Sequence, residues 1–253
     1  SMSVTSSGLS VGADFALTPT FDLGFGGGLG EERTDVGSQD SRVESKTFVG
    51  VVYGSWRPQG GVYFDGMVGY GSLSFDMNRR VAIDSSLVTG SRDGTVVFGS
   101  LGLGFDRLVG TGRLSTYGRL ESLNAELDAY TEVGSTFWAL SYAERDVESL
   151  QGVIGSRYVW SHINRDSVWM PSVRAEYRHE LGEGGVQSLR YADWAGGPVY
   201  QIDQAGWNRG ELNLGVGLNV ETTSGWTGTG ELGARLSNGQ SLGTVRLGIA
   251  RRF

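Results

Sequence analysis

The sequence contains no cysteine, only 4 prolines and a single lysine, Lys46. Without cysteine the chain has no disulfide framework, no zinc–thiolate site and no cysteine nucleophile. Four prolines beside 42 glycines exclude a collagen-like repeat and proline-rich disorder. The net charge of −7 disfavours nucleic acid as a partner. No run of roughly 18 apolar residues occurs, so no transmembrane helix is expected.

Arginine supplies the other twenty of the 21 basic residues. Its planar fork of donors suits pairing with carboxylates in a confined space. A GC-rich genome that favours arginine codons is the alternative explanation, and the sequence leaves both open.

Apolar and polar residues alternate with a period of two along most of the chain, which is typical of β-strands. The alternation is clearest over 211–221, where Leu212, Leu214 and Val216 share one face with Leu218. Helical periodicity is nearly missing. The expected strands are eleven segments, namely 8–17, 21–32, 43–57, 61–75, 94–107, 113–127, 149–160, 169–181, 210–222, 226–237 and 240–253.

The two faces of these segments indicate a membrane protein. Their apolar stretches cover about 9–11 residues, the length that crosses a bilayer at the tilt of a barrel strand. The polar face mixes glycine with both signs of charge, which suits a crowded polar lumen. We therefore expect Leu, Val, Ile and Phe to face lipid and Arg, Glu, Asn and Gly to line the interior. A soluble β fold with an apolar core is the main alternative.

The connections alternate in length along the chain. Short connections at 18–20, 57–60, 109–112, 161–168 and 223–225 alternate with longer ones at 33–42, 76–93, 128–148 and 182–209. Short periplasmic turns opposite longer extracellular loops are typical of outer-membrane barrels. Only the last hairpin on the long-loop side, at Asn238-Gly239, is tight. The predicted fold class is all-β, an antiparallel transmembrane β-barrel of about 12 strands.

Tryptophan supports the same orientation. Trp56, Trp160, Trp169 and Trp226 lie beside the short connections, where an aromatic girdle is expected at the periplasmic headgroups. Tryptophan that only fills strand ends is the alternative, and it predicts no bias toward one side.

The strand count is odd, which matters because single-chain bacterial barrels have an even number of strands. If Phe253 ends in the periplasm, eleven strands place residue 1 on the extracellular side. We therefore predict a twelve-strand barrel whose first strand lies upstream, is poorly patterned, or is hidden in residues 1–7. Residues 1–253 are expected to form one barrel domain. The sequence opens without a signal peptide, so a longer parent protein is expected.

Several short motifs occur in a characteristic order. They are the G-x-x-x-G-x-D strand at 8–14, the aromatic Gly-rich strand at 61–71, Tyr117-Gly118-Arg119-Leu120, the L…G-x-R strand at 150–157, the Pro-led strand at 171–180 and the terminal Arg251-Arg252-Phe253. Together they resemble the translocator β-domain of autotransporters, the type V secretion family. The family's opening strand, with its Trp-x-R-like segment, and its pore-spanning helix do not occur in the sequence and are expected upstream, as is the passenger.

The resemblance implies a C-terminal translocator domain of the bacterial outer membrane that anchors an N-terminal passenger and assists its export. It implies no enzymatic activity, catalytic residue, metal or cofactor. The implied partners are outer-membrane lipids and lipopolysaccharide, the outer-membrane insertion machinery, and the protein's own passenger or linker in cis. A monomer is expected.

The resemblance also assigns an assembly signal to the last strand. Val245, Leu247, Ile249 and Phe253 are expected to form the apolar face that the insertion machinery recognises. The alternative is that Phe253 only ends a strand.

Charged residues on the polar face are the candidate functional residues. On adjacent strands they can pair across the ladder, stiffen the barrel and contact a linker or helix in the pore. A solvated polar face with no ligand is the alternative. The predicted pore-lining residues are Arg113, Arg119, Glu121, Arg174, Glu176, Arg178, Glu180, Glu231, Arg235 and Arg246.

Two other functions stay open, an outer-membrane channel or porin and a barrel hydrolase. The chain has only two histidines, His162 and His179, without metal-ligand spacing. A hydrolase in the barrel would use His179 with Ser188 and Asp193. The alternative is a histidine at headgroup level.

Overall fold

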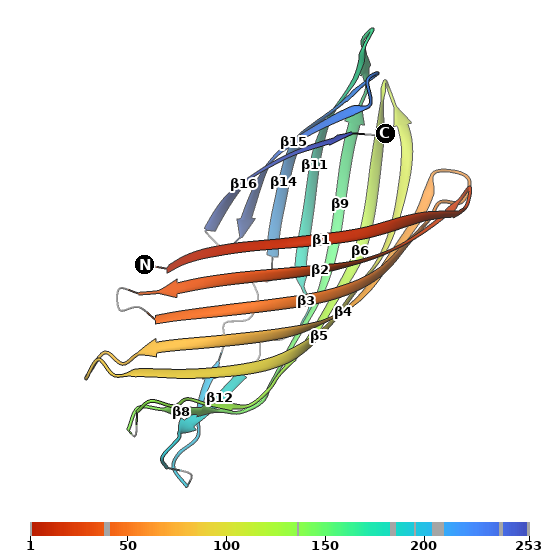
Figure 1. The fold of residues 1–253 in the computed structure, drawn as a ribbon. Helices are drawn as coiled ribbons and strands as arrows, with labels where there is room; N and C mark the ends of the chain where they lie inside the picture. The colour runs from red at the N-terminus through yellow and green to blue at the C-terminus, as the bar shows by residue number, and fades with distance from the viewer. Residues whose placement is uncertain are drawn as a thin grey trace.

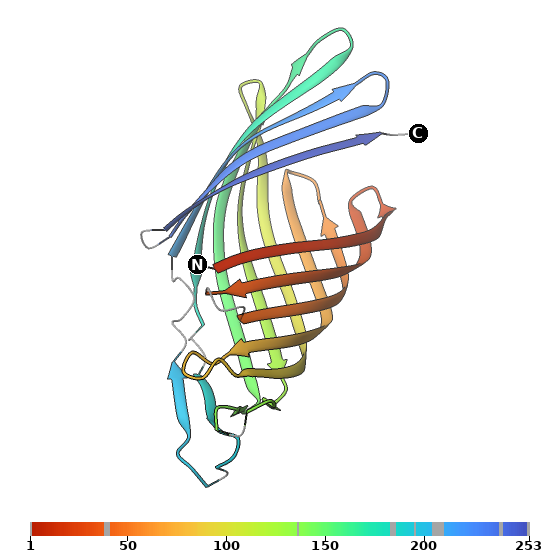
Figure 2. The same ribbon diagram turned by 60° about the vertical axis from the view of Figure 1, so that its left-hand side comes forward.

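The computed structural model describes residues 2–37, 41–135, 137–182, 186–194, 196–203, 210–237 and 240–251. Most of them form one antiparallel sheet that curls into a half-barrel, called the main sheet below (Figures 1 and 2). Among the described residues, no helix is long and apolar enough to cross a membrane. The eleven strands of the main sheet, in spatial order, are β1 (Met2–Thr18), β2 (Phe21–Val36), β3 (Ser41–Trp56), β4 (Val62–Arg80), β5 (Leu87–Val109), β6 (Gly112–Leu127), β9 (Arg145–Trp160), β11 (Ser167–Glu180), β14 (Gly210–Thr222), β15 (Trp226–Ser237) and β16 (Gln240–Arg251).

Strands that follow one another along the chain also lie side by side in the main sheet. Each pairs antiparallel with the next through a short turn or a longer connection, and β10 (His162–Ile163) adds a short pairing to β11. The eleven strands correspond one for one to the eleven segments expected from the alternation. The predicted all-β antiparallel fold is therefore confirmed.

The strands are longer than their apolar stretches. β4 and β5 have 19 and 23 residues and stay paired up to Arg80 and Leu87. The predicted loops 33–42 and 76–93 are thus wrong in extent, because most of each belongs to a hairpin. Polar residues occur on both faces of these segments, as Asn78 and Arg79 show on β4, so the alternation that identifies a strand is interrupted there.

A second, four-stranded sheet lies in the regions predicted as the loops 128–148 and 182–209. Its spatial order is β13 (Tyr200–Asp203), β12 (Val186–Tyr191), β8 (Leu140–Tyr142), β7 (Tyr130–Thr131). Arg79 of β4 holds it to the main sheet by donating to the Glu132 carboxylate from Nε (3.0 Å) and Nη2 (2.5 Å). Glu132 is 5% exposed and also accepts from the Leu140 N–H at 3.0 Å. These loops are therefore folded onto the strand ends.

The two edges of the main sheet are β1 and β16. Within the described part of the chain, β1 pairs only with β2 and β16 only with β15. Residues 2–7 belong to β1, which is paired from the Met2↔Val36 position onward, so a first strand hidden in residues 1–7 is wrong. The two termini lie at opposite ends of the strands, as the parity argument predicted (Figure 1). The Asn238-Gly239 turn and Phe253 lie outside the described residues.

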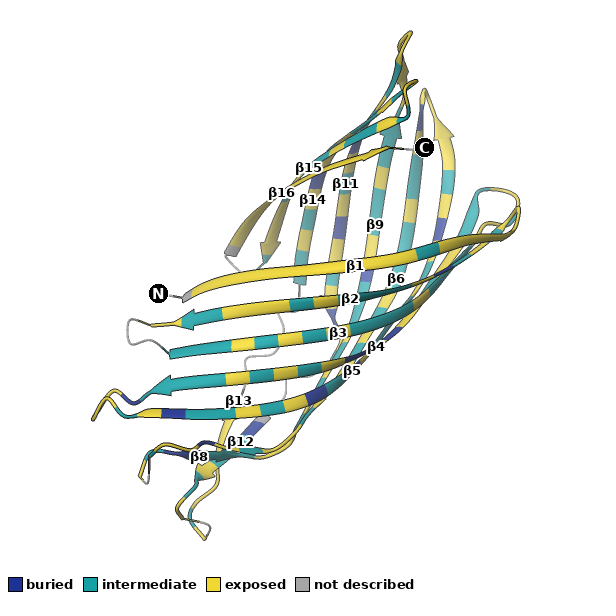
Figure 3. Ribbon diagram, in the orientation of Figure 1, coloured by how far each residue is buried: buried dark blue, intermediate teal, exposed yellow. Residues whose placement is uncertain are grey.

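Exposed and less exposed side chains alternate along the strands (Figure 3). One face carries large exposed apolar side chains such as Leu101, Ile154 and Leu247, which are 73%, 66% and 85% exposed. Trp56 stacks on Phe64 and Trp160 on Tyr158, with ring centroids 5.2 and 5.6 Å apart at the short-turn ends of their strands. This apolar face, called the outward face below, has the composition of a lipid-facing surface.

Candidate functional site: the charged concave face

The opposite face of the main sheet is its concave face, as its long-range side-chain contacts show. Tyr117 on β6 donates a hydrogen bond of 2.7 Å to Glu176 on β11, although β9 lies between these strands. Gly155 of β9 stands opposite both residues in the ladders and leaves the space that the contact needs. Side chains two strands apart converge in this way on the inner side of a curled sheet.

Arg174 joins the next pair of alternate strands. Its Nη1 lies 3.0 Å from Glu176 Oε2 on the same strand, and its Nη2 lies 2.7 Å from Glu231 Oε1 on β15. The intervening residue on β14 is Gly215, which again leaves the path open. Distances this short are typical of charge-assisted hydrogen bonds, which are stronger than neutral ones.

Arg119, Glu121 and Arg178 extend the chain of charges. Arg119 Nε donates to Glu121 Oε1 at 2.6 Å, and its Nη2 lies 3.9 Å from Glu176 Oε1. Arg178 Nη2 lies 3.4 Å from Glu121 Oε2. Three guanidinium groups thus alternate with three carboxylates from β6 through β11 to β15, and their formal charges cancel. We call these six residues and Tyr117 the inner charge network; its members are Arg119, Glu121, Arg174, Glu176, Arg178, Glu231 and Tyr117.

Five members of the network line one side of a hollow of about 900 Å³ on the concave face, namely Tyr117, Arg119, Glu121, Arg174 and Glu176. Further cations, Arg57, Arg113 and Arg157, and two carboxylates, Asp65 and Asp106, line the same hollow. Fixed donors and acceptors of both signs suit the recognition of a polypeptide segment, whose backbone and side chains present both kinds of group. Within the described residues, no group of three or more histidine, aspartate or glutamate side chains could hold a metal ion.

Six of the ten predicted pore-lining residues meet in the network. Of the others, Arg235 and Arg113 lie near carboxylates that the sequence analysis did not select. Arg235 Nε is 3.4 Å from Glu211, and Arg113 Nη1 is 4.0 Å from Asp106. Arg246 stands opposite Glu231 in the β15–β16 register and is exposed.

Glu180 stands apart from the network, because its carboxylate already has four donors. It accepts from Ser149 Oγ at 2.8 Å, Gln151 Nε2 at 2.9 Å, the Leu150 N–H at 2.9 Å and the Gly182 N–H at 3.0 Å. The side chain is 4% exposed. Glu180 therefore fixes the end of β11 to β9, and its oxygens are engaged in this contact.

The residues of this site that were not predicted are Tyr117 of the network, Glu211 and Asp106 beside Arg235 and Arg113, and Arg57, Arg157 and Asp65 around the hollow. The alternation placed Tyr117 on the same face as Arg119, so the signal was available. Asp106 accepts a short hydrogen bond from the Ser115 hydroxyl on β6.

Aromatic rings on the concave face lie flat over glycines of neighbouring strands. Tyr53 covers Gly24 and donates to Asp14 Oδ1 at 2.5 Å, and Tyr63 covers Gly104. A Cβ at either glycine would overlap the ring above it. Glycine therefore lets these rings lie along the sheet, which leaves the space above the sheet free.

The predicted assembly residues and histidines lie elsewhere. Val245, Leu247 and Ile249 are 68%, 85% and 78% exposed on the outward face of the edge strand β16. His179 stacks on the Tyr177 ring, with centroids 6.3 Å apart. Ser188 belongs to the second sheet, opposite Gln201. His179 and Ser188 thus lie in different sheets.

Comparisons with known proteins agree on one family. A family model described as the autotransporter beta-domain matches residues 1–233. The fold is similar to the translocator domain of the autotransporter NalP from Neisseria meningitidis, with a TM-score of 0.76 and 19% identity over 100% of this chain and 82% of that one.

Two further solved structures show the same fold. The beta domain of the Bordetella autotransporter BrkA has a TM-score of 0.65 and 16% identity, over 100% of this chain and 92% of that one. The transport unit of the autotransporter AIDA-I from Escherichia coli has a TM-score of 0.62 and 15% identity, over 100% and 84%. A search of curated proteins found no match.

Proposed function

Because this chain belongs to the autotransporter β-domain family, as an outer-membrane translocator domain for a passenger linked in cis, we propose that its inner charge network holds the exported chain inside the barrel. The observation that supports the proposal is the unbroken path of contacts from Glu231 through Arg174 and Glu176 to Arg119 and Glu121. Paired charges stay in place without a ligand and still offer unused donors and acceptors to a passing segment.

Balanced charge suits a passage for many sequences. A single-sign surface would retain segments of opposite charge and repel others, because charges at these distances interact strongly in a partly dehydrated space. The cancellation of formal charge in the network reduces both effects. The segment is held by many weak polar contacts and can leave in either direction.

The test uses the full-length protein in a Gram-negative host. Arg119→Gln and Arg174→Gln each remove a charge from the network, and Arg33→Gln is the control, since Arg33 pairs with Asp35 at 3.2 Å where both side chains are over 40% exposed. We expect the two network variants to fold, shown by heat-modifiable migration, and to expose passenger to external protease more slowly than the control.

Planar-bilayer recording provides the second readout. Loss of either arginine should change the ion selectivity of the pore, because fixed charges set the field inside it. If both variants match Arg33→Gln in export rate and in selectivity, the proposed role of the network is wrong.

We further propose that the insertion machinery recognises the apolar row on β16. Val245, Leu247 and Ile249 form a continuous exposed row on an edge strand, which suits recognition by strand pairing plus side-chain contact. Leu247→Asp should lower the amount of folded protein in the outer membrane and its crosslinking to the machinery. Ser241→Asp, at the other end of the strand, is the control. Equal insertion of both variants would contradict this assignment.

We also propose that the outward face contacts outer-membrane lipid, with lipopolysaccharide around its long-loop end. The exposed apolar side chains of this face support the proposal. The chain should need detergent or lipid to remain monodisperse, and a stable solution without either would contradict it.

A further inference from the structure

An apolar hollow of about 820 Å³ crosses the outward face from β2 to β9. We propose that this hollow and Arg107, which lies nearer the short turns on the same face, bind an anionic phospholipid. An acyl chain lies in the hollow, and the headgroup phosphate lies at the arginine. The inference rests on the proposed lipid contact of the outward face, and it adds a site and a lipid class at the end opposite the proposed lipopolysaccharide contact.

Large apolar side chains form the walls of the hollow. Trp56 and Phe64 stack on one another at one side, and Ile154, which is 66% exposed, stands at the other. Between these walls, Gly66 and Gly118 have no side chain to fill the space. A Cβ added at either glycine would meet no atom outside the neighbouring residues closer than 3.5 Å. A hydrocarbon chain in this depression makes van der Waals contact with both its floor and its walls.

The outward side of the hollow carries no charge. Asp65 and Arg119 also border it, but the alternation turns both side chains to the concave face, where they line the other hollow. All its other lining residues are glycine or apolar. The hollow therefore suits an acyl chain and not a headgroup, since a polar group placed there would lack a hydrogen-bond partner.

Arg107 lies between the hollow and the short turns. Leu103, Phe105 and Arg107 are successive outward residues of β5, and Arg107 is exposed opposite Leu114 of β6. The four residues from Leu103 to Arg107 span roughly 13 Å. One leaflet supplies about 15 Å of hydrocarbon depth. A phospholipid with its phosphate at Arg107 can therefore lay an acyl chain along Phe105 and into the hollow.

The charge of Arg107 selects the headgroup. Among the described residues, no carboxylate lies within 4.0 Å of its guanidinium group. Of the described outward residues on the short-turn halves of β2 to β6, Arg107 alone is charged. A guanidinium donates two parallel hydrogen bonds to a phosphate. An ammonium group on the headgroup would find no carboxylate here, so the site favours a headgroup with net negative charge.

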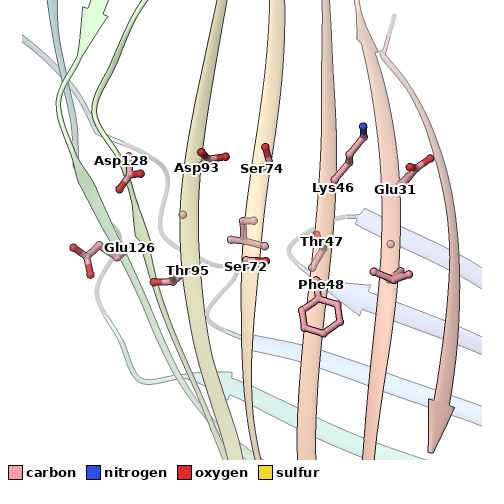
Figure 4. A pocket seen from close by; sticks show the side chains of 14 residues that line it. Glu31, Lys46, Thr47, Phe48, Ser72, Ser74, Asp93, Thr95, Glu126 and Asp128 are labelled. Atoms are coloured by element: carbon pink, nitrogen blue, oxygen red, sulfur yellow. The ribbon is translucent and has the colours of Figure 1, made fainter.

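The long-loop end of the same face has a different charge balance. Its hollow of about 630 Å³ has a single lysine, Lys46, and four carboxylates, those of Glu31, Asp93, Glu126 and Asp128 (Figure 4). The carboxylates offset the field of Lys46, whereas nothing on the short-turn halves of these strands offsets that of Arg107. Arg107 is therefore the better anchor for an anionic phospholipid headgroup.

The test is native mass spectrometry of the purified chain released from nanodiscs. The discs contain phosphatidylglycerol, or phosphatidylethanolamine with the same acyl chains. We expect wild type to retain the glycerol lipid about fivefold better, as one arginine beside an anionic headgroup predicts. Arg107→Gln should abolish this preference. Arg33→Gln removes an arginine from the long-loop end of the outward face and should behave as wild type.

Two further variants test the hollow. Gly66→Leu and Gly118→Leu each fill it with a side chain, so they should lower the retention of both lipids without a change in the ratio. Gly50→Leu is the control, because it adds the same side chain to the outward face of β3 where no atom lies within 4 Å of an added Cβ. Heat-modifiable migration shows that each variant is folded. If a filled variant does not fold, Arg107→Gln decides alone.

Equal retention of the two lipids by wild type, or a preference that survives Arg107→Gln, would overturn the inference. Folded Gly66→Leu and Gly118→Leu chains that retain lipid as well as Gly50→Leu would also overturn it. A chain that stays monodisperse without detergent or lipid contradicts the proposed lipid contact itself. A chain that needs them but shows no lipid preference contradicts this inference alone.

Discussion

Gly155 offers the sharpest test of how the concave face is built. A Cβ added to it would lie 2.7 Å from the Tyr117 ring and 2.8 Å from Glu176 Cγ, both closer than carbon atoms approach in proteins. Tyr117 and Glu176 are bonded to each other over this glycine, so neither side chain can move without loss of the 2.7 Å hydrogen bond. Overpacking costs about 1–3 kcal/mol, and a hydrogen bond to a carboxylate is worth about 1.5 kcal/mol or more. Gly155→Ala should therefore lower the free energy of unfolding by about 2–4 kcal/mol.

The matched control is Gly50→Ala on the outward face of β3, because no atom lies within 4 Å of its added Cβ. That substitution should be neutral or slightly stabilising, since alanine has less freedom to lose than glycine. Urea unfolding in detergent micelles, followed by tryptophan fluorescence, measures both. In a Tyr117→Ala background the cost of Gly155→Ala should fall below about 1 kcal/mol, because the overlapping ring is gone and Glu176, without its hydrogen bond to Tyr117, can shift away from the added Cβ. If Gly155→Ala costs no more than Gly50→Ala, the contact over Gly155 does not hold these strands.

Three further predictions concern the long-loop end. Glu132→Gln should weaken the bidentate pair with Arg79 and destabilise the second sheet by about 2 kcal/mol. This is less than for a fully buried pair, because Arg79 is 37% exposed. Limited proteolysis at 128–148 measures the change, and unchanged cleavage would refute the prediction. Hydrogen bonds from the Ser86 N–H and hydroxyl lower the pKa of Asp84. The turn that contains Asp84 should therefore be stable above the ordinary carboxyl pKa and loosen as pH falls through the lowered pKa. Carbon-detected NMR titration measures the pKa of Asp84, and an ordinary value would contradict the prediction. Burial is the main cause of the raised pKa of Tyr142, and the charge of Glu132 raises it further. The contribution of Tyr142 to stability should therefore be complete below about pH 10 and lost as pH rises through the raised pKa. The difference in absorbance at 295 nm between wild type and Tyr142→Phe measures the ionisation of Tyr142, and ionisation at the usual pH would refute the prediction.

The strands of the main sheet could be predicted because their alternation is local. Leu212, Leu214 and Val216 identify a strand without knowledge of any partner, and antiparallel pairing of sequential strands is the default connection. The same alternation put Arg119, Arg174 and Glu176 on one face. It could not identify which charges meet, since Arg174 reaches Glu231 over Gly215, a contact set by the curl of the sheet.

The second sheet could not be predicted. β7 and β8 have only two and three residues, too few to show a period. Their position depends on Arg79, which is more than 50 residues distant in sequence from Glu132. The contacts of Glu180 could not be predicted for a related reason. Its place in the alternation is that of a lining residue, but backbone N–H groups of Leu150 and Gly182 occupy its carboxylate.

The inner charge network ties β6, β11 and β15 together, whereas the concave side of β2 presents mainly glycine, from Gly24 to Gly30. The two regions should therefore differ in how easily their strands bend inward. Inward bending of the tied strands compresses charged side chains against one another, and inward bending at β2 meets few side chains. The curled sheet thus has a stiff region and a compliant one, so that any widening or narrowing of the lumen would begin beside the β1 edge.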